Sequence, residues 1–271
     1  MAGNGRHLVG LIGAGIGESL SPALHEREAA RRGLEYEYRL LDIAELGAAP
    51  EDLLDAARDE GWSGLNVTHP CKREIVDHLD QLTPAAAQLE AVNTVVMRDG
   101  RAVGHNTDTT GFAESFARGL PDVARDRVVL LGAGGAGAAV AHAAQSLGVE
   151  ELRIVDVDAQ AARELAERVG GTPGELDDIG TADGLIHATP VGMAAHPGLP
   201  LPAELLRADL WVADVVYRPL DTELLRRARE LGCRTLDGGG MAVFQAAGSF
   251  ELFTGVAPDR ERMLADFAEL A

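Results

Sequence analysis

The fold of this chain is decided by residues 128–137, which read Val-Val-Leu-Leu-Gly-Ala-Gly-Gly-Ala-Gly. Four apolar residues in succession are typical of a strand that is buried on both faces of a sheet. The glycines that follow satisfy the G-x-G-x-x-G pattern at positions 132, 134 and 137, which is typical of a turn that binds the phosphates of a dinucleotide. An alanine-rich helix as far as about Leu147 and a strand at 152–155 complete a predicted β-α-β unit.

Asp156 ends the second strand of this unit, about 20 residues beyond the last glycine, where an acid binds the ribose hydroxyls of adenosine. Asp158 follows it, and no Lys or Arg occurs between Arg153 and Arg163. Because carboxylates repel the extra phosphate of NADP, the two aspartates predict NAD as cofactor in preference to NADP. An S-adenosylmethionine methyltransferase also has a glycine-rich loop and such an acid, but the third glycine, Gly137, favours a dinucleotide.

The part of the chain before this unit places polar side chains where predicted strands end. Short strands are predicted, with a tight turn at Asp99-Gly100 between the last two, at 8–12, 36–41, 64–68, 92–96 and 101–105. In an open α/β sheet the ligand binds at the carboxyl ends of the strands. The polar residues at or just beyond these ends are Ser19, Ser21, Asn66, Thr68, Lys72, Asn93, Thr94, Asn106 and Asp108. Four such clusters predict a binding site rather than four unrelated turns.

Together these patterns predict an α/β protein of two domains with a cleft between them. A dinucleotide-binding domain of the Rossmann type is predicted over residues 109–239. A substrate-binding catalytic domain, an open α/β structure, is predicted to be formed by both ends of the chain, residues 1–108 and 240–271. Three successive glycines at 238–240 indicate a hinge, after which the final helices are expected to return to the first domain.

Composition excludes several classes of protein. The chain has 271 residues, 46% of them hydrophobic, and a formal charge of −19, which argues against nucleic acid or an anionic membrane as the main partner. Its two cysteines, Cys71 and Cys233, have no paired spacing, which indicates a reducing compartment and no zinc site. The N-terminus has no apolar signal core and no stretch is long and apolar enough for a membrane span, so a cytoplasmic location is expected.

Seven short motifs, in the same order along the chain, match a known family. They are Ser19-Leu20-Ser21-Pro22, Asn66-Val67-Thr68 with Pro70 and Lys72, Ala91-Val92-Asn93-Thr94, Asn106-Thr107-Asp108, the 132–137 loop, Ala188-Thr189-Pro190 with Gly192-Met193, and Asp237-Gly238 with Met241 and Gln245. On these motifs the chain resembles the shikimate dehydrogenases over nearly its whole length. The resemblance implies reversible oxidation of the C3 hydroxyl of shikimate to 3-dehydroshikimate with NAD or NADP.

The resemblance also implies roles for individual residues. Lys72 and Asp108 match the catalytic pair of the family. Positions that hold the substrate carboxylate and hydroxyls are matched by Ser19, Ser21, Asn66, Thr68, Asn93 and Gln245, and a position near the substrate is matched by Tyr217. The glycine motif, its acids and the neighbouring strand ends place the cofactor on Gly132, Gly134, Gly135, Ala136, Gly137, Asp156, Asp158, Thr189, Val216, Gly238 and Met241.

The sequence departs from the commonest pattern of the family at two places. NADP-dependent biosynthetic members usually carry Asn-Arg-Thr where Asp156-Val157-Asp158 stands here, and they usually have glycine in place of Thr109. In both respects the chain looks more like the NAD-dependent quinate/shikimate dehydrogenases of actinobacterial type. Some quinate-using members differ at Leu20 or Ser21, so the Ser-Leu-Ser sequence leaves quinate as an open second substrate.

The chemistry requires one proton to leave the alcohol as the hydride is transferred to the cofactor. An amine can accept that proton when burial lowers its pKa, and a neighbouring carboxylate anchors the amine against the reacting hydroxyl. We therefore take Lys72 as general acid/base and Asp108 as the residue that positions it; the alternative is a structural ion pair. His69 and His105 flank this region, and without a ligand spacing for a metal we expect them to be packing residues.

Four readings of the function follow, of which NAD-dependent oxidation of shikimate, with quinate as a further substrate, is the main one. The alternatives are an NADP-dependent biosynthetic shikimate dehydrogenase, a dehydrogenase of aminoshikimate or aminoquinate, and a non-catalytic nucleotide sensor. Each takes small molecules as its partners. The preferred direction, the choice between shikimate and quinate, and whether the protein is a homodimer stay open at this point.

Overall fold

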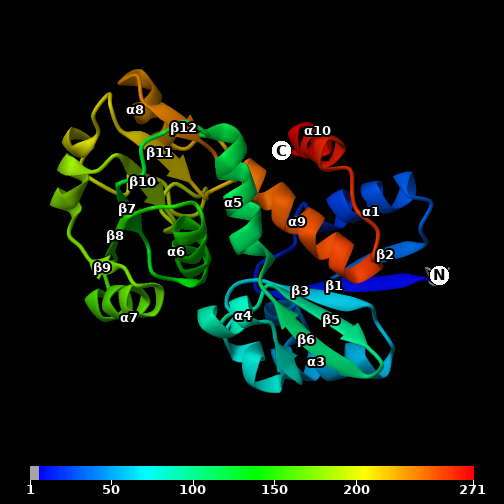
Figure 1. The fold of residues 1–271 in the computed structure, drawn as a ribbon. Helices are drawn as coiled ribbons and strands as arrows, with labels where there is room; N and C mark the ends of the chain where they lie inside the picture. The colour runs from blue at the N-terminus through cyan, green and yellow to red at the C-terminus, as the bar shows by residue number, and fades with distance from the viewer. Residues whose placement is uncertain (1–5) are drawn as a thin grey trace. The chain divides into compact units, whose positions relative to one another are not determined.

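The computed structural model describes residues 6–271, and these form two compact units. Unit 1 holds the described residues up to Thr107 together with Val243–Ala271, and unit 2 is the continuous segment Asp108–Ala242. Both units are α/β, so the predicted two-domain α/β fold is confirmed (Figure 1). The assignment of a binding role to each unit stays a prediction.

Unit 1 is built on a mixed sheet with the strand order β2-β1-β3-β5-β6-β4. Its strands are β1 (His7–Gly13), β2 (Tyr36–Asp42), β3 (Gly64–Val67), β4 (Gln81–Leu82), β5 (Thr94–Arg98) and β6 (Arg101–His105). The first three are parallel, and β5 runs antiparallel to both of its neighbours. The predicted tight turn joins β5 to β6, because Asp99 and Gly100 both have a positive φ, 52° and 74°, as a two-residue hairpin turn requires.

Helices cover both faces of this sheet. They are α1 (Ser21–Arg31), α2 (Ile43–Leu46), α3 (Pro50–Asp59), the short 3-10 helix η1 (Glu74–His78), α4 (Pro84–Leu89), α9 (Gly239–Thr254) and α10 (Arg260–Leu270). One face packs Ile12 and Leu65 against Leu54 of α3. The other packs Val9 and Tyr38 against Phe253 of α9. The C-terminal segment therefore supplies part of the core of the unit that the N-terminal segment begins.

The last helix is attached to the first by ion pairs around Glu28. This carboxylate is completely buried on α1, where it contacts Arg31 at 2.9 Å and Arg32 at 2.8 Å and accepts the backbone N–H of Asp259 at 2.7 Å. Arg31 also contacts Asp266 of α10 at 2.5 Å. A buried carboxylate is tolerated when it is paired and fully hydrogen-bonded, as here. The C-terminal helix therefore lies beside α1 (Figure 1).

Unit 2 is a parallel sheet with the strand order β12-β11-β10-β7-β8-β9. Its elements are α5 (Thr107–Gly119), β7 (Arg127–Leu131), α6 (Gly135–Ser146), β8 (Glu151–Val155), α7 (Ala159–Val169), β9 (Thr172–Pro173), η2 (Leu176–Thr181), β10 (Gly184–His187), η3 (Ala203–Leu205), β11 (Trp211–Asp214), α8 (Glu223–Glu230) and β12 (Arg234–Leu236). Counted from β7, this is the order 3-2-1-4-5-6 of the Rossmann fold. The predicted Rossmann-type domain is thus confirmed.

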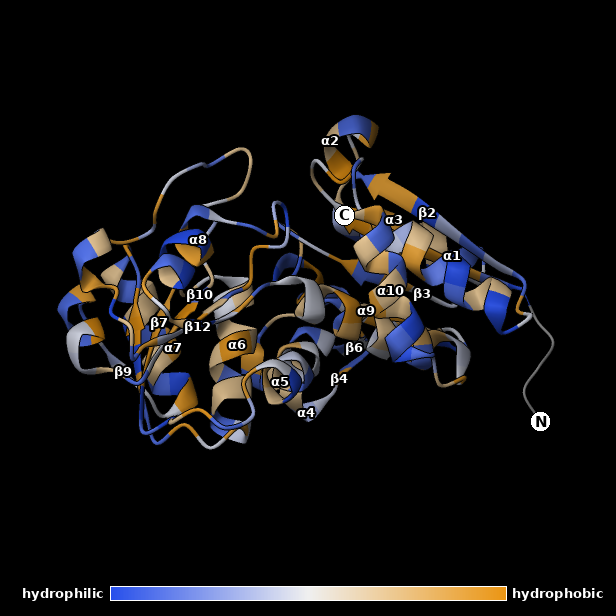
Figure 2. Cartoon of the chain, turned by 90° about the horizontal axis from the view of Figure 1, so that it is seen from above, coloured by the Kyte–Doolittle hydropathy of each residue, from blue (hydrophilic) through white to orange (hydrophobic). Residues whose placement is uncertain are grey.

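The pattern of hydropathy agrees with these layers. The buried strands β7, β10 and β11 are almost continuously apolar, as parallel strands between two helical layers should be. Figure 2 shows α6 in mainly apolar colours, whereas α8 carries a hydrophilic face. Among residues 6–271, no helix is long and apolar enough to cross a membrane.

Two segments differ from the sequence prediction. The apolar spacing of residues 73–79 is typical of an amphipathic helix that would begin just after Lys72, but the structure has a turn there followed by the 3-10 helix η1. The β-branched pair Ile75-Val76 lowers the helix propensity of a run that is already too short to propagate. The glycines predicted as a hinge include Gly239 and Gly240, which form the first turn of the continuous helix α9.

Candidate active site

The glycine-rich loop after β7 lies at the topological switch point of the second sheet, between β7 and β10. Gly132 has a φ of +108°, and a Cβ there would lie 2.5 Å from the carbonyl oxygen of Ala188, which follows β10. A Cβ on Gly137 would lie 2.0 Å from the carbonyl oxygen of Gly132. These two glycines are therefore required by close backbone contacts, which bring the start of α6 against the end of β7.

Gly134 is different, because its backbone faces open space. No atom of the described chain, apart from its neighbours in sequence, lies within 4 Å of a Cβ built on it. Gly134 is the N-cap of α6, whose first N–H groups have no partner within the helix. An open backbone at a helix N-terminus fits the approach of a pyrophosphate. Gly135 and Ala136, predicted to bind the cofactor, form the first turn of this helix.

Asp156 ties the end of β8 to this loop. One of its carboxylate oxygens accepts the N–H of Ala133 at 2.7 Å, and the other accepts the N–H of Asp158 at 2.9 Å. Asp158 itself is the N-cap of α7, where its carboxylate accepts the N–H groups of Gln160 and Ala161. Val157 between them is fully exposed. Asp156 therefore stands beside the loop of the open glycine, with Asp158 next to it, and carboxylate acceptors at this place fit the ribose hydroxyls of a dinucleotide, which donate.

A buried polar network joins the loops that follow β10 and β11. His187 is completely buried and contacts the carboxylate of Asp214 through Nδ1 at 2.9 Å and the hydroxyl of Thr189 through Nε2 at 2.5 Å. Asp214 also accepts the N–H of Val216 at 3.0 Å and the hydroxyl of Thr222 at 2.7 Å. The network therefore holds two predicted cofactor residues, Thr189 and Val216. His187 and Asp214 are not among the residues predicted from the sequence, although a polar residue at the end of each of two adjacent apolar strands was a usable signal.

The remaining predicted residues, Gly238 and Met241 for the cofactor and Tyr217 and Gln245 for the substrate, lie in the loop after β11 and around the start of α9. A Cβ on Gly238 would lie 2.4 Å from the carbonyl oxygen of Val215, so glycine is required there. Met241 is buried in the first turn of α9, and Gln245 follows one turn later, half-buried. Tyr217 is 40% exposed in the loop after β11.

In unit 1 the loop that carries Ser19 is fixed at two points. The carboxylate of Asp42 accepts the N–H of Ile16 at 2.9 Å, and this bond lowers the pKa of Asp42. A Cβ on Gly13 would lie 2.3 Å from the methyl group of Thr68, so the loop packs directly on the turn after β3. The Ser19 hydroxyl accepts the N–H of Ser21 at 3.3 Å. The structure therefore brings the loop of Ser19 against Thr68.

The amides of Asn66 and Asn93 are joined through Thr94. Nδ2 of Asn66 donates to the Thr94 hydroxyl at 3.2 Å, and this hydroxyl donates to Oδ1 of Asn93 at 3.0 Å. Oδ1 of Asn93 also accepts the N–H of Thr107 at 2.7 Å. All four side chains are at least nine-tenths buried. Two predicted substrate residues are thus coupled to the first residue of α5, which immediately precedes Asp108.

The two predicted catalytic residues belong to different units. Lys72 lies half-buried in unit 1, in the turn after β3, where its carbonyl oxygen accepts the N–H of Val92 at 2.8 Å. Asp108 is buried at the start of α5, where unit 2 begins. The sequence predicts that this pair meets, and their pairing remains a prediction. His105 lies half-buried at the end of β6, and burial, with Arg98 nearby, lowers its pKa.

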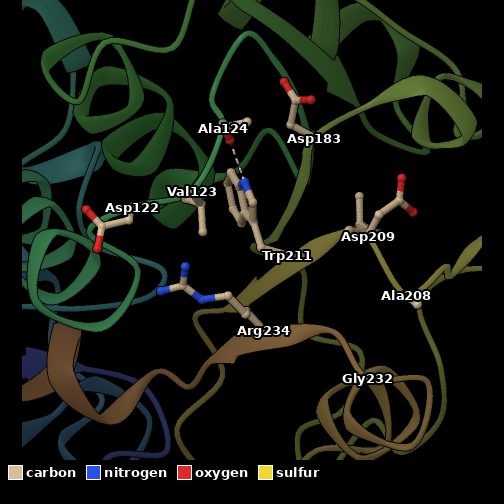
Figure 3. Close-up of a pocket in the computed structure, with 10 residues that line it drawn as sticks. Asp122, Val123, Ala124, Asp183, Ala208, Asp209, Trp211, Gly232 and Arg234 are labelled. Carbon is tan, nitrogen blue, oxygen red and sulfur yellow. Dashed lines mark hydrogen bonds between the residues drawn. The ribbon is translucent and has the colours of Figure 1, made fainter.

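A hollow of about 260 Å³ opens at the opposite end of the second sheet, away from the glycine loop. Trp211 at the start of β11 forms its floor and donates its indole N–H to the carbonyl oxygen of Ala124 at 2.8 Å (Figure 3). Arg234 and Asp183 stand at its rim. None of the predicted site residues lines it. In the described part of the chain, no group of three or more His, Cys, Asp or Glu side chains could hold a metal ion.

Comparison with known proteins identifies the family. Two family models match, the shikimate dehydrogenase substrate binding domain over residues 11–95 and the shikimate 5'-dehydrogenase C-terminal domain over residues 238–265. The chain is 63% identical to a shikimate dehydrogenase (NADP(+)) of Streptomyces avermitilis, covering 98% of this chain and 96% of the relative. It is 47% identical to a quinate/shikimate dehydrogenase (NAD(+)) of Corynebacterium efficiens, covering 97% of this chain and 98% of the relative.

Solved structures agree. The quinate dehydrogenase of Corynebacterium glutamicum in complex with NAD superposes with a TM-score of 0.93 at 44% identity, over 97% of this chain and 99% of that chain. The shikimate 5-dehydrogenase of Thermus thermophilus in complex with NADP(H) and shikimate superposes with a TM-score of 0.89 at 34% identity, over 98% and 100% of the two chains. The glycine loop, the acid after β8 and the full-length likeness together show that the chain belongs to the shikimate dehydrogenase family.

Proposed function

We propose that this protein is an NAD-linked dehydrogenase that interconverts shikimate and 3-dehydroshikimate, with quinate and 3-dehydroquinate as a second substrate pair. The observation that carries the proposal is the open backbone of Gly134 beside the carboxylate of Asp156. The open backbone of Gly134 supports the approach of a pyrophosphate, and the carboxylate of Asp156 supports the binding of an adenosine ribose with free hydroxyls. The substrate follows from the relatives, whose names give shikimate and quinate.

NAD is proposed in preference to NADP on electrostatic grounds. Asp156 and Asp158 stand together at the end of β8, and a 2′-phosphate next to either would meet an uncompensated carboxylate. The Corynebacterium relatives named for NAD, and the related structure with NAD, support this choice. The Streptomyces relative is named for NADP, so the NADP-dependent biosynthetic enzyme is the alternative that the experiment must separate.

The proposed mechanism gives each part of the chain one task. NAD, when bound, accepts the hydride from C3 of the substrate. Lys72 accepts the proton of the C3 hydroxyl and returns it in the reverse direction, and Asp108 holds the amine of Lys72 toward that hydroxyl. Ser19, Ser21, Thr68, Asn93 and Gln245 bind the carboxylate and the remaining hydroxyls. Asn66 contributes less directly, since both of its N–H groups already donate within the protein.

The test is to measure the reduction of NAD and of NADP, separately, by the purified protein with shikimate and then with quinate. We expect reduction of NAD with both substrates and a much lower kcat/KM with NADP. Activity with NADP and shikimate alone would contradict the cofactor assignment and indicate the biosynthetic enzyme. Turnover of neither substrate, with dinucleotide binding intact, would favour the amino-substituted substrates or the nucleotide sensor.

The same proposal includes a cytoplasmic location, and the choice between a monomer and a homodimer is left to experiment. The location is supported by Cys71 and Cys233, which are both buried and unpaired, as is usual in a reducing compartment. Light scattering of the purified protein distinguishes a dimer from a monomer of 28.5 kDa.

A further inference from the structure

The phenol of Tyr38 lies between two of the residues that the proposed function assigns to the substrate. Tyr38 is on β2, 7% exposed, and its hydroxyl is 2.8 Å from Oδ1 of Asn66, which is 6% exposed. The side chain of Ser21 is its second hydrogen-bond partner. Neither the family motifs nor the strand-end pattern includes Tyr38, because in the sequence it is only one apolar position of an alternating strand.

The orientation of the Asn66 amide can be assigned from its neighbours. One side of the amide faces the backbone carbonyl oxygen of Asn93 at 3.3 Å, and a carbonyl oxygen can only accept. The nitrogen must therefore be on that side, and Oδ1 must face Tyr38. It follows that the Tyr38 hydroxyl donates its proton to Asn66.

The direction of the remaining bonds follows from this assignment. With its own proton committed to Asn66, the Tyr38 oxygen can only accept, so the Ser21 hydroxyl donates to it. On the other side, Nδ2 of Asn66 donates to the Thr94 hydroxyl, which donates in turn to Oδ1 of Asn93. A single chain of hydrogen bonds thus runs in one direction from Ser21 through Tyr38, Asn66 and Thr94 to Asn93.

The chain is shielded from water along most of its length. Burial raises the pKa of Tyr38 far above the ordinary value of a phenol, so the hydroxyl keeps its proton at every physiological pH. Inside a protein, hydrogen bonds in a chain polarise one another, and a fully satisfied network fixes one orientation of each member. The two ends of this chain, Ser21 and Asn93, are both assigned to the substrate.

We propose that Tyr38 is a positioning residue for substrate binding, which sets the orientation of the Ser21 hydroxyl and, through Asn66 and Thr94, supports the Asn93 amide, whose Oδ1 also accepts the N–H of Thr107. The inference rests on the proposed function, since it assumes that Ser21 and Asn93 bind the substrate. Without the phenolic hydroxyl, Oδ1 of Asn66 loses the donor that it faces, and the Ser21 hydroxyl loses its acceptor and is free to rotate. The substrate then meets polar side chains in a mixture of orientations and binds more weakly, whereas the cofactor site in unit 2 is unaffected.

The chain offers a matched control on the same strand. Tyr36 lies two residues before Tyr38 and points to the same face of the sheet, and its hydroxyl contacts Nδ1 of His25 at 2.8 Å. Tyr36→Phe and Tyr38→Phe each remove one phenolic hydroxyl that is hydrogen-bonded in this core. A loss of thermal stability should therefore be common to both variants, whereas a change in substrate affinity should be confined to Tyr38→Phe.

The experiment compares the KM for shikimate and for NAD in the wild-type protein and the two variants. We expect Tyr38→Phe to raise the KM for shikimate about three- to tenfold, the loss of one net hydrogen bond, with the KM for NAD unchanged. Tyr36→Phe should change neither constant. If the KM for shikimate were the same in the two variants and the wild-type protein were active, the role of Tyr38 would be wrong but the proposed function would stand. A wild-type protein without shikimate turnover would overturn the proposed function as well.

A second pair of variants covers the case in which Tyr38→Phe does not fold. Thr94→Val breaks the same chain with a side chain of equal shape, and Thr94→Ser keeps the hydroxyl. Thr94→Val should raise the KM for shikimate as Tyr38→Phe does, and Thr94→Ser should have a KM close to that of the wild type. The same KM in Thr94→Val and in the wild type would show that the chain does not orient the site.

Discussion

His25 is a histidine without contact to solvent, in the middle of α1. Its ring contacts the hydroxyl of Tyr36 at 2.8 Å and that of Ser249 at 3.4 Å, and burial lowers its pKa to about 3. In the unfolded chain the same ring takes up a proton near pH 6.5. Between these two values the unfolded state binds more protons than the folded state, so acid favours unfolding.

We therefore expect His25 to make its full contribution to the free energy of unfolding above about pH 6.5. This contribution should be lost as the pH falls toward 3, at up to about 1.4 kcal/mol per pH unit. His25→Gln removes the titrating ring. Urea unfolding of both proteins between about pH 7 and about pH 5 should show a shallower decline of the unfolding free energy in the variant. Parallel declines would mean that His25 titrates normally in the folded protein.

Lys72 provides the second prediction at this scale. Lys72→Ala should lower kcat about 10²- to 10⁴-fold, the usual effect of losing a positioned acid/base, with a smaller change in the KM for NAD. The control is Arg73→Ala, which removes the adjacent exposed cation and should leave kcat unchanged. Steady-state oxidation of shikimate measures both. Comparable rates in the two variants would exclude Lys72 as the proton acceptor.

At the scale of residues, sequence motifs predicted the polar side chains of the site but not the residues that hydrogen-bond to them and hold them in place. Ser21 begins α1, Asn66 is the penultimate residue of β3 and Asn93 immediately precedes β5, and short sequence motifs single out all three. Tyr38 acts through Asn66, and its partner lies 28 residues further along the chain, on a strand that β1 separates from β2. Such a contact depends on strand order, which local patterns do not encode.

Among the elements, the glycine loop before α6 contains two glycines, Gly134 and Gly137, with different roles. A Cβ on Gly137 would meet a backbone oxygen at 2.0 Å, and neither group can move away. Gly134 has an ordinary backbone, with φ −74° and ψ −168°, and open space beside it. Gly137 therefore serves the fold, and Gly134 leaves space for the dinucleotide that is proposed to bind there.

Gly134→Ala and Gly137→Ala separate these roles. We expect Gly134→Ala to keep the wild-type melting temperature but to weaken NAD binding by about tenfold or more, because its methyl group occupies the space of the pyrophosphate. Gly137→Ala should lower the melting temperature and abolish binding together. Calorimetric titration with NAD and thermal unfolding measure the two effects. If Gly134→Ala bound NAD as tightly as the wild type, the dinucleotide would lie elsewhere.

The elements that sequence patterns predicted well are those with a strong local signal. The strand 128–131, its glycine loop and the turn at Asp99-Gly100 each require residue types that few other structures require. The elements α2 and β4 escaped prediction because they are only four and two residues long. The latter is held by its pairing with β6, which adjoins it in space. Its existence depends on tertiary structure rather than on propensity.

For the molecule as a whole, the choice of cofactor can be tested through stability. A ligand that binds only the folded protein raises the unfolding free energy by about 2.7 kcal/mol at a hundred times its Kd. We expect NAD to raise the melting temperature by about 5–10 °C under these conditions and NADP, at the same concentration, by less. Asp156→Ala should reduce the difference between the two. A larger shift with NADP would contradict the electrostatic argument.

The discontinuity of unit 1 also has a consequence for how the protein is made. All six strands of its sheet precede Thr107, but Phe253, which packs against Val9 and Tyr38, belongs to the last tenth of the chain. During translation, residues 108–242 must leave the ribosome in between, which takes on the order of ten seconds. Throughout that interval the nascent sheet exposes the part of its apolar face that α9 covers in the folded protein. We expect the inserted unit to fold first, and the N-terminal segment to be the natural client of a ribosome-associated chaperone.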